Sequence, residues 1–290
     1  NVTVDASTLA LKSGNAIILR GGSESFYSSK VITTSIRNAL KKSSLPVDSV
    51  QMINTVDRRA VGKLLKMNEL INLIIPRGGK SLIERVQKDS KIPVLSHLDG
   101  LCHTFIDKKA DKQMSLEIAL NAKMRRTGIC GATETLLCHK DSSQNILPEI
   151  ITKLIEKGCE VRGDKTVQSI NNDVKPASNK DWQTEYLDSI ISIKIVNDVF
   201  DAIEHIEKYG SNHTDAIITN NMRNAEIFLN NVNSAIVIHN ASTQYADGGE
   251  FGMGAEMGIA TGKLHARGPV ALEELTTYKY QLRGKGQVRP

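Results

Sequence analysis

Short apolar runs alternate with amphipathic segments along the first hundred residues of the chain. An apolar run closed by glycine or proline is typical of a buried strand, whereas apolar positions three or four residues apart are typical of a helix. Strands are therefore predicted over residues 15–20, 50–53, 70–75 and 92–95. Helices are predicted between them, over residues 26–43, 58–67 and 81–89. This alternation, with glycine-rich turns such as Gly21-Gly22, predicts an α/β fold built on a parallel, doubly wound sheet.

The same alternation continues after Gly100, with more polar connections between the elements. Strands are predicted over residues 135–139, 189–196, 216–219 and 235–238. Helices are predicted over residues 110–124, 147–157, 199–209 and 225–231. Residues 160–184 are polar and are predicted to be surface loops with one short strand. His97 and His103 are predicted to lie in a loop around Gly100 rather than to form a pair of metal ligands.

Composition places the chain among soluble globular proteins. It has 290 residues, of which 40% are apolar and 24% charged, enough for one large core or two ordinary ones. No apolar run reaches the length of a membrane span. The net charge of +5 is spread along the chain and aromatic residues make up only 4%. This composition disfavours a stacking surface for nucleic acid but suits a small anionic substrate.

The four cysteines form no CxxC pair, which favours a reducing compartment and argues against a zinc site, so no metal is expected. Cys130 is the strongest candidate nucleophile, because it lies between Gly128 and Gly131 and follows three cations within residues 123–126. Nearby positive charge and backbone N–H groups favour the thiolate, which is the reactive form. From the residues alone, a small cysteine buried in a turn explains Cys130 equally well.

Two glycine-rich stretches resemble nucleotide-binding motifs without matching them. Gly79-Lys80-Ser81 could end a P-loop, but that pattern requires a glycine where Ile74 stands. Gly252-Met253-Gly254 could begin a dinucleotide fingerprint, but Met257 occupies the place of the third glycine. Both are better interpreted as structural turns.

Several separate runs of the chain together resemble the γ-glutamyl phosphate reductase family of the aldehyde dehydrogenase superfamily. They are residues 15–23, 75–79, 121–123, 128–137, 246–261 and 265–269. The resemblance covers essentially the whole chain and implies an aldehyde-dehydrogenase-like fold. It implies a Rossmann-type cofactor-binding domain over residues 1–99, a catalytic domain over 100–245, and a return segment with an oligomerisation tail over 246–290. Asn1 is neither an initiator methionine nor part of a signal-peptide pattern, and the family has more chain before this position.

The resemblance also implies the chemistry. The Cys130 thiolate would attack the acyl phosphate of L-glutamyl 5-phosphate and expel phosphate, and NADPH would reduce the resulting thioester to L-glutamate 5-semialdehyde, the second step of proline biosynthesis. The backbone N–H of Cys130 and the side-chain amide of Asn1 would hold the oxyanion. Hydrolytic members of the superfamily carry a glutamate before the turn that here reads Pro76-Arg77-Gly78-Gly79. Its absence suits an enzyme that reduces its thioester and does not hydrolyse it.

Binding residues also follow from the resemblance. The expected cofactor contacts are Arg20, Gly21, Gly22, Ser23, Arg77, Gly78, Gly79 and Glu185. A neutral Ser23 beside Arg20 favours NADP(H), because NAD-preferring relatives often carry a glutamate at this position. The expected substrate contacts are Arg125, Arg126, His265 and Arg267. For each of these four, solvated surface charge is an equally good interpretation.

The resemblance further implies a cytoplasmic enzyme that forms a dimer or tetramer through the tail at 276–290, and it suggests the preceding glutamate kinase as a partner. Two other classes of function are considered. A chain truly beginning at Asn1 would lack the first strands of the cofactor sheet and would be a non-catalytic remnant or an interaction module. A basic nucleic-acid-binding protein would bind with a steep salt dependence.

Overall fold

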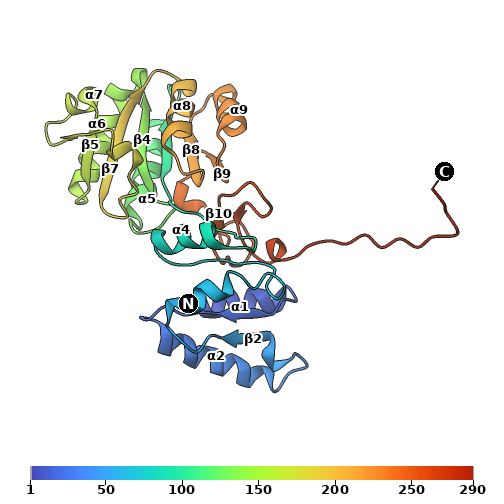
Figure 1. Ribbon diagram of the computed structural model, residues 1–290. Helices are drawn as coiled ribbons and strands as arrows, with labels where there is room; N and C mark the ends of the chain where they lie inside the picture. The colour runs from blue at the N-terminus through green and yellow to red at the C-terminus, as the bar shows by residue number, and fades with distance from the viewer. Residues whose placement is uncertain (1, 290) are drawn as a thin grey trace.

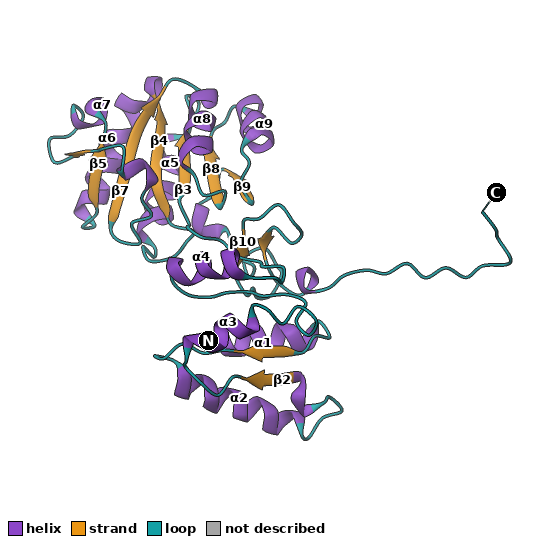
Figure 2. Ribbon diagram, viewed as in Figure 1, coloured by secondary structure: helices purple, strands orange, loops and turns teal. Residues whose placement is uncertain are grey.

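The larger part of the chain is built on a seven-stranded, fully parallel sheet, as the computed structural model of residues 2–289 shows (Figures 1 and 2). Its strand order is β6-β5-β7-β4-β3-β8-β9. The strands are β3 (Cys102–Ile106), β4 (Thr133–His139), β5 (Glu160–Gly163), β6 (Lys175–Pro176), β7 (Ile190–Val196), β8 (Thr214–Ile218) and β9 (Ile236–His239). Parallel strands need crossover connections, which helices supply here.

Helices cover both faces of this sheet. They are α5 (Lys112–Met124), α6 (Lys140–Glu156), α7 (Lys165–Gln168), α8 (Val199–Tyr209) and α9 (Met222–Asn231). Successive side chains of a strand point to opposite faces, so Ile106 and Leu136 belong to one apolar cluster and Phe105 and Leu137 to another. The first cluster includes residues of α5 and α6, and the second includes residues of α8 and α9. Burial on both faces explains why β3 and β4 are buried at every position.

The smaller part contains the first helices and a short parallel pair of strands (Figure 2). Its elements are α1 (Val2–Lys12), β1 (Ile17–Leu19), α2 (Phe26–Leu40), β2 (Val50–Met52), α3 (Arg58–Leu64) and α4 (Lys80–Asp89). The end of the chain returns to this part through the antiparallel pair β10 (Ile259–Ala260) and β11 (Gly268–Pro269). Met257 packs with Leu9 of α1, and Val270 packs with Leu95, so residues distant in sequence share one core.

Four 3₁₀ helices are described: η1 (Val47–Ser49), η2 (Asp181–Gln183), η3 (Thr243–Tyr245) and η4 (Glu273–Leu275). Beyond η4 the chain runs away from the rest of the molecule (Figure 1), and Tyr280 and Leu282 are each 93% exposed. Among residues 2–289, no helix has the length and apolar character needed to cross a membrane. The division into three domains stays a prediction.

The α/β fold class is confirmed, and most predicted elements lie within a few residues of the observed ones. The strands expected over 70–75 and 92–95 are reduced to one parallel bridge between Ile74 and Val94. Proline explains this, because Pro93 has no N–H to extend a ladder and Pro76 ends the first run. The helix expected from Leu147 starts seven residues earlier, at Lys140, and accommodates Pro148 in its interior.

The main error concerns β3, which was predicted to be a loop around Gly100 and is a central strand of the sheet. His103 is completely buried in it. Its backbone N–H and its ring Nδ1 bind the same Asp215 carboxylate oxygen, at 2.9 and 2.8 Å. A polar side chain can be buried when its partners are supplied in this way, and Asp215 lies too far along the sequence for a local pattern to reveal it.

Two buried histidines make the stability of the fold depend on pH. In α8, burial with the neighbouring His103 and Lys194 lowers the pKa of His205 to about 2. Burial lowers the pKa of His213, just before β8, to about 3. An unfolded histidine takes up a proton near pH 6.5, so below that pH the unfolded state binds more protons than the folded state. Stability therefore falls as the pH drops through 6.5.

Replacing His205 with phenylalanine should remove one of these two contributions. Between pH 7 and pH 5, the free energy of unfolding of the wild-type chain should fall by about 2 kcal/mol more than that of His205→Phe. Urea unfolding at the two pH values measures the difference. Equal losses in both proteins would mean that His205 is not buried in its neutral form.

Candidate active site

The amino ends of the parallel strands bring distant segments together at one edge of the sheet. Gly100 precedes β3, Cys130 precedes β4, Glu185 precedes β7 and His213 precedes β8. All the strands of a parallel sheet begin at the same edge, so the segments before them become neighbours. A cleft of about 300 Å³ lies here, and Cys130 and residues of the turn before α4 line it.

Because Gly100 has no side chain, the backbone of Cys130 can pack directly against it. A Cβ at this position would lie 2.3 Å from the carbonyl oxygen of Cys130 and 2.5 Å from its Cα. The N–H of Gly100 donates to Oε1 of Glu185 at 2.9 Å, so one buried glycine contacts both the candidate nucleophile and a candidate cofactor ligand. From β3, the thiol of Cys102 donates to the same Cys130 carbonyl at 3.1 Å. The backbone of Cys130 is therefore fixed by two neighbouring segments.

Gln244, in η3, fixes the other end of this loop. Its Nε2 donates to the carbonyl of Ala122, at 2.8 Å, and to that of Arg126, at 3.2 Å. Its Oε1 accepts a hydrogen bond from Nε of Arg125 at 3.0 Å. Gly131 lies close to the same segment, since a Cβ there would be 3.3 Å from the carbonyl oxygen of Thr243.

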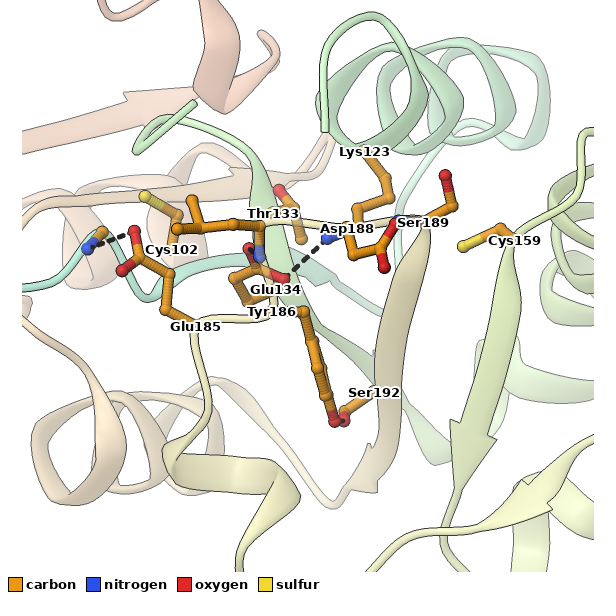
Figure 3. Close-up of polar contacts among 12 residues, drawn as sticks. Cys102, Lys123, Thr133, Glu134, Cys159, Glu185, Tyr186, Asp188, Ser189 and Ser192 are labelled. Atoms are coloured by element: carbon orange, nitrogen blue, oxygen red, sulfur yellow. Dashed lines mark hydrogen bonds and ion pairs between the residues drawn. The ribbon is translucent and has the colours of Figure 1, made fainter. Parts of the chain in front are cut away.

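A buried ion pair joins α5, β4 and the loop that carries Glu185 (Figure 3). Nζ of Lys123 lies 2.6 Å from Oε2 of Glu134, and both side chains are almost completely buried. Oε1 of Glu134 accepts the N–H of Leu187 at 3.3 Å, and the Lys123 ammonium lies 5.9 Å from the ring centroid of Tyr186. Breaking one partner of such a pair leaves an uncompensated buried charge. The pair thus ties the helix before Cys130 to the strand after it.

The electrostatics of Cys130 differ from the sequence prediction. The cations of residues 123–126 were expected to favour its thiolate, but Lys123 is paired with Glu134 and Arg125 is bound to Gln244. Burial raises the pKa of the Cys130 thiol to about 11. Arg77, from a separate segment, is the cation that lowers this pKa, while the carboxylates of Glu256 and Glu185 raise it.

Two histidines that sequence reasoning did not connect with Cys130 lie beside it. One ring nitrogen of His97, one of His213 and Sγ of Cys130 all lie within 4.8 Å of one another. The two rings meet edge to face, with their centroids 4.9 Å apart. Their positions come from three different loops with no fixed spacing, so only the topology of the sheet could have brought them together.

Glu256 is a further residue that the sequence did not single out. Its carboxylate accepts the N–H of Gly248 at 3.0 Å. Burial raises its pKa, while the nearby Arg77 lowers it. The glycine-dense character of this segment and its family resemblance were the available signals, and neither gave a role to the carboxylate.

The expected cofactor residues fall into two groups. Arg77 and Gly78 line the cleft with Cys130. Gly79 is the N-cap residue of α4. Glu185 lies in the same region, where it accepts the N–H of Gly100. The other four, residues 20–23, follow the carboxyl end of β1 in the smaller part of the chain. There the guanidinium of Arg20 donates to the carbonyl of Val56 at 2.6 Å.

The expected substrate residues are not among those that line the cleft. Arg125 binds Gln244, as described above. The guanidinium of Arg267 donates to the backbone carbonyl and to Oδ1 of Asn233, at 2.8 and 3.2 Å. The side chains of Arg126 and His265 are exposed. Asn1, the expected second oxyanion donor, lies outside the described residues.

The raised pKa of Cys130 predicts how the free protein reacts with an alkylating reagent. Only the thiolate reacts, and at pH 8 a pKa of about 11 leaves on the order of one thousandth of Cys130 ionised. Alkylation by iodoacetamide should accelerate roughly tenfold per pH unit from pH 7 to pH 10, with Cys130 labelled first. Burial raises the pKa of Cys102 and of Cys138, and that of Cys159 to about 12, so these should react later.

Arg77→Gln should slow this labelling at any fixed pH in the same range, because it removes the cation that lowers the pKa of Cys130. The matched control is Arg85→Gln, which changes another arginine, on α4. Mass spectrometry of the labelled peptides gives both rates. A labelling rate that levels off below pH 8 would contradict the raised pKa.

Comparison with known proteins shows the family to which the chain belongs. Residues 1–169 match the aldehyde dehydrogenase family. Over its whole length, the chain is 57% identical to the γ-glutamyl phosphate reductase of Paramagnetospirillum magneticum and covers 69% of that protein. It is 56% identical to the corresponding protein of Rhodospirillum rubrum and covers 68% of it.

The fold is also close to that of a solved relative. The crystal structure of γ-glutamyl phosphate reductase from Thermotoga maritima superposes with a TM-score of 0.97 at 47% identity, covering 100% of this chain and 70% of that one. An acetylating aldehyde dehydrogenase from Geobacillus thermoglucosidasius shares the fold with a TM-score of 0.74 at 15% identity, covering 99% of this chain and 73% of that one. The chain belongs to the aldehyde dehydrogenase family and, within it, to the γ-glutamyl phosphate reductases, which are oxidoreductases.

Proposed function

We propose that this chain reduces L-glutamyl 5-phosphate to L-glutamate 5-semialdehyde and phosphate with NADPH, through a thioester on Cys130. The observation that carries the proposal is the position of Cys130 in a cleft that Arg77 and Gly78 also line. Family membership supports the reaction, and the geometry supports the nucleophile. As a step in proline biosynthesis, the reaction would take place in the cytoplasm.

In the first step, the Cys130 thiolate attacks the acyl carbonyl carbon, and phosphate leaves with the bonding electron pair. The tetrahedral oxyanion needs fixed donors, for which the backbone N–H of Cys130 and the Asn1 amide are the candidates. Arg77 supplies positive charge beside the sulfur. The turn of Gly78 and Gly79 leads into α4, whose N-cap residue has no side chain to occupy the free N–H groups. Such a helix start is suited to the phosphate.

The cleft also favours reduction over hydrolysis. Pro76 and Arg77 supply no carboxylate where hydrolytic relatives place their water-activating glutamate. Of the two carboxylates near Cys130, Glu185 accepts the N–H of Gly100 through one oxygen, and Glu256 accepts the N–H of Gly248 through one oxygen. A thioester formed here would therefore persist until it is reduced or returned to phosphate.

Membership of this family implies a nicotinamide cofactor, which supplies the hydride for reduction of the thioester. Residues at the start of α2 fit its phosphate groups. Ser25 makes no side-chain hydrogen bond as N-cap of that helix, and nothing lies within 4 Å of a Cβ built on Gly22. Nε of Arg20 is buried without a partner among the described residues. Arg20 beside the neutral Ser23 would accept a 2′-phosphate, which favours NADP(H).

The remaining assignments extend the same proposal. Glu185 would hold the nicotinamide ribose, near Gly100 and Cys130. Arg126 and His265, with exposed side chains, would contact the anionic substrate together with Arg125 and Arg267. The exposed tail that follows η4 would join protomers into a dimer or tetramer, and glutamate kinase, which makes the substrate, is the proposed partner.

Cys130→Ala should lower the phosphate-dependent reduction of NADP⁺ by glutamate 5-semialdehyde by ~10³-fold or more, because Cys130 is the only cysteine among the described residues that line the cleft. The assay follows NADPH absorbance. Cys159→Ala is the matched control and should retain activity. Circular dichroism should show the same fold for both variants, and substantial turnover by Cys130→Ala would refute the nucleophile assignment.

Gly100→Ala should lower the turnover number by ~10²-fold, because its Cβ would displace the Cys130 carbonyl and a shift of about 1 Å costs that much in a reacting geometry. Gly262→Ala is the matched control, since a Cβ there meets nothing within 4 Å. Turnover and thermal unfolding are measured together. A folded Gly100→Ala protein with full activity would show that this glycine does not position Cys130.

A further inference from the structure

The cluster of His97, Cys130 and His213 has the composition of a transition-metal site. Imidazole nitrogen and thiolate sulfur are the ligands that Zn²⁺ prefers. The three candidate ligand atoms lie within 4.8 Å of one another. In a tetrahedral zinc site, ligand atoms are roughly 3.5 Å apart, as follows from the usual bond lengths. A contraction of about 1 Å would bring the cluster to that geometry.

In each of the two histidines one ring nitrogen, Nδ1, lies within hydrogen-bond distance of an oxygen atom. Nδ1 of His97 lies 2.7 Å from the carbonyl oxygen of Ile259. A carbonyl only accepts, so Nδ1 carries the proton and Nε2 keeps its lone pair. A hydrogen bond from the other ring nitrogen to a backbone carbonyl is the usual support of a metal-bound histidine.

The ring of His213 also has one nitrogen near a hydrogen-bond acceptor, and its other nitrogen has no partner among the described residues. Its Nδ1 lies 2.9 Å from Oγ1 of Thr214, which can accept the ring proton. Its Nε2 is buried with no hydrogen-bond partner among the described residues, and the side chain is completely buried. A buried polar atom without a partner is costly, and a bound cation would satisfy it.

The surrounding charges allow a cation at this position. Arg77 opposes a cation, whereas the carboxylates of Glu185 and Glu256 favour one. Three protein ligands leave a fourth position open to the cleft, because Cys130 lines the cleft.

We propose that His97, Cys130 and His213 bind a thiophilic divalent cation, Zn²⁺, and that this binding blocks the reductase by occupying the sulfur nucleophile. On binding, the Cys130 S–H bond breaks, its proton passes to solvent and an S–Zn²⁺ bond forms without any change of oxidation state. The inhibitory consequence rests on the proposed function, whereas the binding itself does not.

Co²⁺ replaces Zn²⁺ as a spectroscopic probe, because its thiolate complex has a charge-transfer band and its tetrahedral sites absorb visible light. The tag-free, fully reduced chain should bind one Co²⁺, and Zn²⁺ should displace it. Cys130→Ala should lose the charge-transfer band. His97→Asn and His213→Asn should each weaken Co²⁺ binding by ~10-fold or more.

The matched control is His205→Asn. It also removes a buried histidine whose Nε2 has no partner, but His205 lies outside the cluster, so this variant should bind Co²⁺ as the wild type does. Circular dichroism checks that each variant is folded. Absence of the thiolate–cobalt band in the wild type, or a band unchanged in both His97→Asn and His213→Asn, would overturn the site.

An activity assay tests separately whether bound Zn²⁺ inhibits the enzyme. Zn²⁺ should inhibit phosphate-dependent semialdehyde oxidation, and a chelator should restore it. Full turnover by the Zn²⁺-loaded enzyme would refute the inhibition. A wild-type chain that shows the cobalt band but never turns over would support the metal site and count against the proposed function, so the two failures can be distinguished.

Discussion

The contact between Gly100 and the backbone of Cys130 is the constraint on which the rest of the site depends. No side chain can occupy position 100 while Cys130 keeps its place, because the nearest backbone atom would be only 2.3 Å from the new Cβ. The same glycine binds Glu185 through its N–H. The proposed nucleophile and the proposed ribose ligand are therefore placed relative to each other by one residue, before any cofactor or substrate binds.

This contact exists because the site lies at the amino ends of the large sheet. In open α/β sheets, ligands usually bind at the carboxyl ends of the strands, and the proposed cofactor residues 20–23 lie at such an end, after β1. Cys130, His213 and Gly100 instead precede their strands. The return segment covers this edge, as its Ile259 both pairs in β10 and binds His97. Burial of this edge raises the pKa of Cys130, and Arg77 is the charge that offsets it.

The sequence predicted most of the local structure and singled out the candidate nucleophile. β7 and α8 follow from their apolar patterns within a residue or two, and Cys130 was identified from its flanking glycines and the family resemblance. β3 was missed because His103 and Thr104 are polar, and their partners Asp215 and Thr133 come from other strands. The hydrogen bond from Arg125 to Gln244 was not predicted, because Gln244 lies more than a hundred residues away. The spacing of apolar and polar residues along the chain does not reveal hydrogen bonds between side chains that are distant in sequence.

In the proposed chemistry, Cys130 supplies the nucleophilic sulfur, and the acyl group stays bound to that sulfur as a thioester until it is transferred. A reaction run from glutamate 5-semialdehyde and NADP⁺ without phosphate tests this directly, since the thioester should form but have nothing to receive it. We expect a burst of about one NADPH per active site, and mass spectrometry should find a glutamyl group on the peptide that carries Cys130. Continued turnover without phosphate, or a burst that leaves Cys130 unmodified, would contradict a persistent thioester on this residue.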